Sequence, residues 1–133
     1  MENLFVIKIG GNVVDNDPAL QSFLTNFAAI PQKKILVHGG GRIATTLGRQ
    51  LGIEPDYING RRITDGSAID LVTMVYGGLV NKKMVASLQA NHCNAIGLTG
   101  ADANIIPAVK RPVADIDYGF VGDIKYDSVG VNN

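Results

Sequence analysis

A lysine followed closely by two glycines is the first group of residues that could do chemistry. Lys8 ends the apolar run LFVIK, and Gly10 and Gly11 follow after one further residue. A lysine in an apolar strand needs an anionic partner, because an unpaired buried charge is costly. Glycines after a strand let backbone N–H groups approach a phosphate closely. The segment indicates an anion site, and the alternative is a lysine extending to solvent beside an ordinary turn.

A second glycine cluster, Gly39–Gly41, follows the apolar residues ILV and His38. Glycines between a strand and a helix form an anion-binding nest at the helix N-terminus. The run from Gly39 to Ala44 also matches the dinucleotide pattern G-x-G-x-x-G/A. The acidic residue expected about 20 positions later, however, has no apolar strand leading to it. For His38 we favour a strand-end histidine held by local hydrogen bonds, because no acid–base partner is identifiable.

Two adjacent arginines, Arg61 and Arg62, follow the dipeptide Asn59–Gly60, which is a strong hairpin-turn signal. The pattern predicts short strands at 56–58 and 62–64. Arginine recognises carboxylates and phosphates bidentately, so this hairpin could form a lid over an anionic ligand. The alternative is a solvated edge strand protected by its charges. The spacing alone does not decide which arginine faces inward.

No metal site is expected. The single cysteine, Cys93, excludes a disulfide within the chain and a cysteine cluster. Several acidic and amide residues of the last third lack ligand spacing, and solvated turns explain them better. They are Asp102, Asn104, Asp115, Asp117 and Asp123.

Strands and helices alternate through the first 52 residues and must position the two glycine clusters. We expect strands at 4–9, buried on both faces, and at 35–38. We expect a helix capped by Asp17 that stops at Pro31, and another over 42–51. This order predicts a right-handed βαβ unit and a parallel sheet. Both glycine clusters then fall at the carboxyl edge of the sheet, where α/β folds bind ligands.

The rest of the chain is expected to contain one long helix, 68–91, with Gly77–Gly78 in its middle. Each glycine costs such a helix up to ~1 kcal/mol relative to alanine. The pair suggests another backbone passing closely, such as a subunit interface, or ordinary packing against the chain's own sheet. The expected apolar stripes contain Ile69, Val72, Val75, Leu79, Val85 and Leu88. Further strands are expected at 94–99, 105–109, 113–117 and 120–126, with a turn at Tyr118–Gly119.

Composition narrows the classes of function. Twelve basic residues balance twelve acidic ones, which argues against a nucleic-acid or acidic-membrane binder. The chain is 46% hydrophobic and 18% charged, as in a globular domain, and its 133 residues suit a single domain. No apolar run approaches the ~18 residues of a membrane span, and the start lacks a signal-peptide pattern, so a cytoplasmic protein is expected.

Taken in order, the motifs resemble those of the amino acid kinase family, and within it the acetylglutamate kinases. They are KIGG, HGGG, the NGRRIT hairpin, the long helix with two glycines, AIGLTG and YGFVGDI, and together they span the chain. The resemblance implies an α/β fold, a three-layer αβα sandwich with a mainly parallel central sheet plus β-hairpins. It implies that residues 1–133 form an N-terminal domain for amino-acid-substrate binding and dimerisation. A C-terminal ATP-binding domain would follow, its first helix beginning near Asn132.

The resemblance also implies a reaction, phosphoryl transfer from ATP with Mg²⁺ to the γ-carboxylate of N-acetyl-L-glutamate in arginine biosynthesis. N-succinyl-glutamate is a further possible substrate. The implied roles are transition-state stabilisation by Lys8, phosphate binding by Gly10 and Gly11, substrate binding by Gly40 and Gly41, and a clamp on the substrate α-carboxylate by Arg62. Helix 68–91 would form a homodimer interface.

Three other functions stay open beside this one. They are another amino acid kinase of the carbamate or glutamate 5-kinase type, a non-catalytic binding or dimerisation module, and a dinucleotide-binding domain. The resemblance argues against arginine feedback and a hexamer, because the first strand begins by Leu4 without the preceding helix of arginine-inhibited members.

Overall fold

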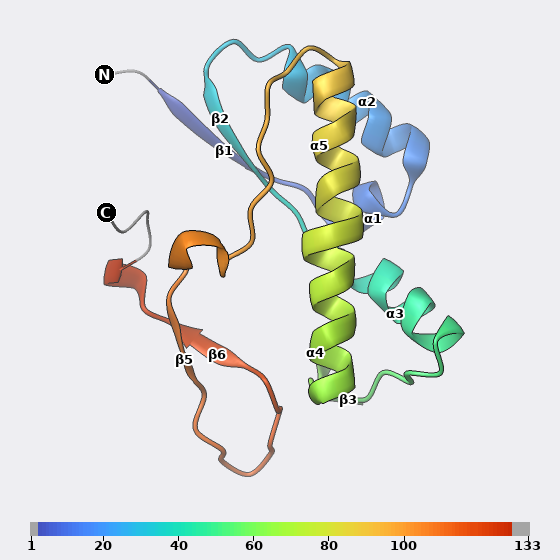
Figure 1. The fold of residues 1–133 in the computed structure, drawn as a ribbon, viewed down its shortest axis with the longest axis vertical. Helices are drawn as coiled ribbons and strands as arrows, with labels where there is room; N and C mark the ends of the chain where they lie inside the picture. The colour runs from blue at the N-terminus through green and yellow to red at the C-terminus, as the bar shows by residue number, and fades with distance from the viewer. Residues whose placement is uncertain (1–2, 129–133) are drawn as a thin grey trace.

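The computed structural model describes residues 3–128 (Figure 1). Its elements in chain order are β1 (Leu4–Lys8), α1 (Gly11–Val14), α2 (Asp17–Ala28), β2 (Lys33–Val37), α3 (Gly41–Gln50), β3 (Tyr57–Ile58), β4 (Arg61–Arg62), α4 (Gly66–Val72), the π-helix η1 (Thr73–Val80), α5 (Asn81–Ala90), the 3-10 helix η2 (Asp102–Asn104), β5 (Ala108–Lys110), β6 (Gly122–Ile124) and the 3-10 helix η3 (Tyr126–Ser128). Within these residues, no helix is long and apolar enough to cross a membrane. The helix expected near Asn132 lies outside the described residues.

Strands β1 and β2 pair in parallel, from Leu4 opposite Lys33 to Lys8 opposite Val37, as the βαβ pattern predicts. Helix α2 connects them, with Pro18 in its first turn. Its N-cap is Asn16 rather than the expected Asp17, because the Asn16 side chain accepts a 3.0 Å hydrogen bond from the Ala19 N–H.

The helices cover one face of this parallel pair. Ile7, Ile9 and Leu36 point into the core. Helices α2 and α5 lie side by side over this face (Figure 1). They share a 2.8 Å hydrogen bond that the Ser87 hydroxyl donates to the Gln21 side chain. The opposite face is exposed, so the expectation that strand 4–9 is covered on both faces is wrong for the described residues. That face carries Leu4, Val6, Ile35 and Val37, which are 56%, 63%, 48% and 43% exposed.

The predicted long helix is present from Gly66 to Ala90, but its middle, η1, is a π-helix. The buried residues show the change of period. They are Ala68, Leu71 and Val75, then Val80, Met84 and Leu88, so the step from 75 to 80 is five residues where the others are three or four. The predicted stripe through Leu79 is therefore wrong, because the wider turn leaves Leu79 38% exposed and buries Val80 instead.

Among residues 3–128, the glycine pair of this π-helix meets no other backbone. A Cβ at Gly77 would stand 2.9 Å from the Thr99 side chain, and one at Gly78 would meet nothing within 4 Å. The closest neighbour of Gly77 is thus the Thr99 side chain of the same molecule.

Two of the expected strands do not form. Residues 94–99 belong to no ladder, because side chains of α5 take up their carbonyls: Lys82 binds the Gly97 oxygen at 2.8 Å and Gln89 the Ala95 oxygen at 3.1 Å. An apolar groove of about 850 Å³ separates this segment from β2.

The other missing strand, 113–117, lies in the connection between β5 and β6. These two strands pair antiparallel and are shorter than expected. Pro112 has no N–H with which to continue the ladder beyond Arg111.

Candidate functional site

The hairpin places Arg62 opposite Tyr57. Strands β3 and β4 pair antiparallel, with Tyr57 facing Arg62 across the ladder. Asn59 and Gly60 both have positive φ, 52° and 75°, as the predicted two-residue turn requires. The hairpin is confirmed, although its strands are shorter than expected and the second begins at Arg61.

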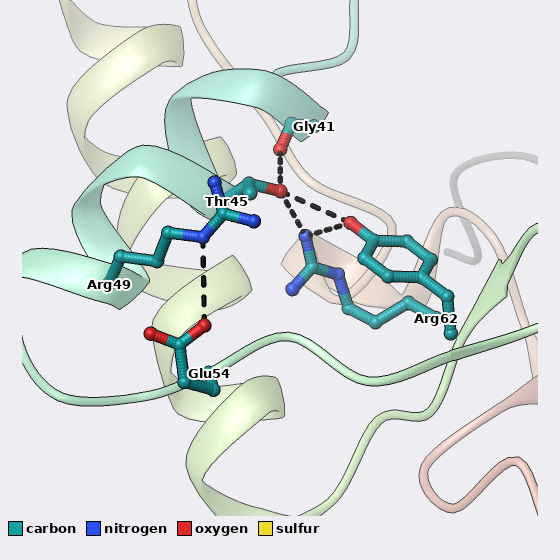
Figure 2. A network of polar contacts seen from close by, with 6 residues as sticks. Gly41, Thr45, Arg49, Glu54 and Arg62 are labelled. Carbon is teal, nitrogen blue, oxygen red and sulfur yellow. Dashed lines mark hydrogen bonds and ion pairs between the residues drawn. The ribbon is translucent and has the colours of Figure 1, made fainter.

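Arg62 turns toward the helix that follows the second glycine cluster (Figure 2). Its Nη2 donates 2.8 Å to the hydroxyl of Thr45 on α3 and 2.7 Å to the hydroxyl of Tyr57. Thr45 in turn donates 2.9 Å to the carbonyl of Gly41, one helical turn earlier. Arg61 is exposed whereas Arg62 is half-buried, so Arg62 is the arginine that the hairpin brings to Gly41.

Tyr76 of the π-helix packs beneath the same glycines. A Cβ at Gly40 would stand 3.1 Å from the Tyr76 ring and 3.3 Å from Val80, and one at Gly41 would stand 3.7 Å from the Tyr76 hydroxyl. A side chain at Gly40 would therefore have to displace the Tyr76 ring and Val80 by a few tenths of an ångström. Burial raises the pKa of the Tyr76 hydroxyl, while the nearby Arg62 charge opposes that rise.

Lys8 and the first glycines lie at the end of the neighbouring strand. Lys8 pairs with Val37, and the next residue, Ile9, donates 2.9 Å to the Val37 carbonyl. The Lys8 side chain is exposed, and among residues 3–128 it has no ion pair or hydrogen bond. Gly10 is the N-cap of α1, and a Cβ there would meet nothing within 4 Å. The two glycine clusters thus follow adjacent parallel strands, as predicted.

An ion pair links the two glycine-rich turns. Arg42, at the start of α3, donates 2.6 Å to Oδ2 of Asp15, which follows α1. The same Oδ2 lies 3.6 Å from where a Cβ of Gly11 would stand. The pair therefore ties the turn after β1 to the helix after β2.

His38 is held by hydrogen bonds, as expected for a strand-end histidine, although only one of them is local. Its Nδ1 lies 3.0 Å from the Gly39 carbonyl, and its Nε2 lies 3.3 Å from the side-chain amide nitrogen of the buried Asn81. A neutral imidazole protonated on Nδ1 satisfies both contacts.

Sequence reasoning missed Thr45, Tyr57 and Tyr76. Two of these had a usable signal: a two-residue turn at 59–60 pairs position 57 with 62, and Thr45 lies one helical turn after Gly41. Tyr76 had none, because its direction depends on the π-helix. Among the described residues, no group of three or more His, Cys, Asp or Glu side chains could hold a metal ion.

Comparison with known proteins agrees with the order of the motifs. Residues 3–129 match the amino acid kinase family. The chain is 60% identical over 126 residues to an acetylglutamate kinase of Cytophaga hutchinsonii, covering 94% of this chain and 48% of that protein. It is 59% identical over 129 residues to one of Phocaeicola vulgatus, covering 97% and 50%. The chain thus spans about half the length of these relatives.

Solved structures share the fold. The crystal structure of smu.665 from Streptococcus mutans matches with a TM-score of 0.74 and 26% identity, over 94% of this chain and 51% of that one. An N-acetylglutamate synthase from Neisseria gonorrhoeae, complexed with coenzyme A and N-acetyl-glutamate, matches in fold with a TM-score of 0.67 and 21% identity, over 92% and 28%. With the family match across residues 3–129, the chain belongs to the amino acid kinase family.

Proposed function

We propose that the protein containing this chain transfers a phosphoryl group from ATP to the γ-carboxylate of N-acetyl-L-glutamate, a step of arginine biosynthesis. The identity of about 60% to acetylglutamate kinases supports this reaction over that of other amino acid kinases. The observation that carries the proposal is the Arg62 guanidinium, hydrogen-bonded beside the Gly41 turn. An arginine there suits a substrate with a carboxylate remote from the reacting one.

The substrate half of the site recognises the acylated amino acid. In this proposal Arg62 binds the α-carboxylate, and the backbone at Gly40 and Gly41 lies against the rest of the substrate. The β3–β4 hairpin covers it as a lid. Binding at these points, away from the reacting atoms, holds the γ-carboxylate in place and so lowers the entropic part of the barrier.

The phosphate half neutralises charge. A γ-carboxylate oxygen attacks the terminal phosphorus of ATP, the bond from that phosphorus to the bridging oxygen breaks, and ADP leaves with the bonding electrons. The carboxylate is already ionised, so no proton has to be removed. Lys8 offsets the charge on the transferring group, and the N–H groups of Gly10 and Gly11 bind phosphate oxygens. ATP brings Mg²⁺, to which we assign no ligand among the described residues.

The proposal also covers the domain organisation and the oligomeric state of the protein. Residues 1–133 form the domain that binds the amino acid and dimerises through the helix from Gly66 to Ala90, and a separate domain binds the ATP base. We also propose that the protein acts in the cytoplasm.

Replacement of Lys8 tests the phosphate half, in protein expressed from the complete coding sequence. We expect Lys8→Ala to lower kcat by about 10²–10³-fold with little change in KM, because the interaction is made mainly in the transition state. Lys125→Ala, at an exposed lysine that follows β6 and lies outside the proposed site and interface, is the matched control and should leave kcat unchanged. Steady-state assays with N-acetyl-L-glutamate and ATP measure both.

Two results would overturn the proposal. If Lys8→Ala raises KM while kcat stays unchanged, Lys8 only binds. If the unaltered protein phosphorylates free glutamate or carbamate but no acylglutamate, the chain belongs to another branch of the family.

A further inference from the structure

The guanidinium of Arg62 is held through one of its three nitrogens. Nη2 donates to Thr45 at 2.8 Å and to Tyr57 at 2.7 Å. Among residues 3–128, Nη1 and Nε have no acceptor, which leaves three of the five guanidinium N–H groups available. The side chain is therefore fixed in place while most of its donors stay free for a ligand.

The two hydroxyl groups can be arranged in only one way. The Thr45 hydroxyl donates its single proton to the Gly41 carbonyl oxygen, 2.9 Å away. The contact of 3.1 Å between the two hydroxyls must then be donated by Tyr57, and the Tyr57 oxygen is left to accept from Arg62. Each proton has one destination, so the orientation of Arg62 is set by the Gly41 turn through Thr45 and Tyr57.

The Tyr57 ring contributes little to the core, since Tyr57 is 47% exposed and lies outside the buried cluster. Its ring faces Arg62, with the guanidinium carbon 5.0 Å from the ring centroid. Loss of the hydroxyl alone would keep this cation–π contact and remove the hydrogen bonds. The contribution of the hydroxyl can thus be measured apart from that of the ring.

We propose that Tyr57 and Thr45 are positioning residues that preorganise Arg62 for a ligand carboxylate and dock the β3–β4 lid onto α3. The proposal rests on the function proposed above for the choice of ligand. It assigns the affinity for the acylated amino acid partly to two hydroxyls that do not themselves touch it. Figure 2 shows how the chain of contacts runs from Gly41 through Thr45 to the hairpin.

The test compares Tyr57→Phe and Thr45→Val in protein from the complete coding sequence. We expect each to raise KM for N-acetyl-L-glutamate about tenfold, the effect of one hydrogen bond to a charged group. The values of kcat and KM for ATP should stay within about twofold, and Thr45→Ser, which keeps the hydroxyl, should retain the original KM. Tyr126→Phe is the control, because Tyr126 is 83% exposed and far from Arg62 in sequence.

A second readout needs no activity. In ¹⁵N NMR spectra, hindered rotation of the Arg62 guanidinium is expected in the unaltered protein and free rotation in Tyr57→Phe and Thr45→Val. If both variants keep KM and the hindered rotation, the inference is wrong even where acylglutamate is phosphorylated. If the unaltered protein phosphorylates no acylglutamate, the proposed function fails, and the rotation of Arg62 alone decides whether these hydroxyls position it.

Discussion

At the scale of single residues, Tyr76 lies between Gly40 and Gly41 and the charge of Arg62. Its ring closes the space behind Gly40, and its hydroxyl lies beside Gly41. Burial raises the pKa of this hydroxyl above its usual value near 10, and the charge of Arg62 offsets only part of the rise. The folded state therefore prefers the neutral phenol.

This preference predicts an alkaline loss of stability. Above pH 10 the unfolded chain releases the Tyr76 proton before the folded chain does, so the unfolded state binds fewer protons and the free energy of unfolding falls as pH rises. Tyr76→Phe should remove that part of the fall. Urea denaturation at pH 8 and at about pH 11 measures it, and an equal pH dependence in both proteins would contradict the assignment.

At the scale of elements, the end of the β3–β4 hairpin is held by a segment far along the chain. The Thr64 N–H donates 2.9 Å to the Tyr118 carbonyl, and the Phe120 N–H donates 2.7 Å to the Thr64 carbonyl. Between them, Gly119 has φ of 76°, and a Cβ there would overlap the Thr64 carbonyl oxygen. The YGF motif therefore needs glycine both for its conformation and for this contact.

Gly119→Ala should accordingly destabilise the chain and loosen the attachment of the β3–β4 hairpin. We expect the free energy of unfolding to fall by about 1–3 kcal/mol, from strain at positive φ and the lost contact. Faster hydrogen exchange at the Thr64 amide would locate the effect. Gly66→Ala is the control, since a Cβ there meets nothing within 4 Å. Similar melting temperatures for the two variants would show that the bridge contributes little.

The elements predicted from sequence are those with local signals. Asn59–Gly60 specified its hairpin, and the alternation of apolar runs with glycines specified the parallel pair. The strand expected at 94–99 failed because a ladder also needs a partner strand, and a hydrophobic run does not reveal one. The stripe through Leu79 failed because a period of 3.6 was assumed across a stretch that turns more slowly. Tyr76 was missed for the same reason.

At the scale of the whole molecule, apolar side chains remain on the outer side of the long helix. Met74 is 57% exposed and Leu79 is 38% exposed, both within the π-helix. Contiguous exposed apolar side chains mark surfaces that bind another protein, and these two lie five residues apart in one helix. They support the proposal that this helix forms the homodimer interface.

Met74→Glu should weaken that dimer, because a charge at the centre of an apolar contact loses its hydration. Sedimentation velocity of protein from the complete coding sequence should show a shift from dimer to monomer. Ser22→Glu adds the same charge at an exposed position of α2, outside the proposed interface, and should leave the dimer intact. A dimer unaffected by Met74→Glu would place the interface elsewhere.

The exposed face of β1 and β2 has a consequence for handling the 133 residues on their own. This face carries Leu4, Val6, Ile35 and Val37, while the chain has no net charge at pH 7 and an isoelectric point near 6.7. Electrostatic repulsion between molecules keeps such apolar faces apart, and it is weakest near neutral pH because the net charge there is close to zero. Colloidal stability of these residues alone is therefore lowest at the pH at which enzymes are usually purified.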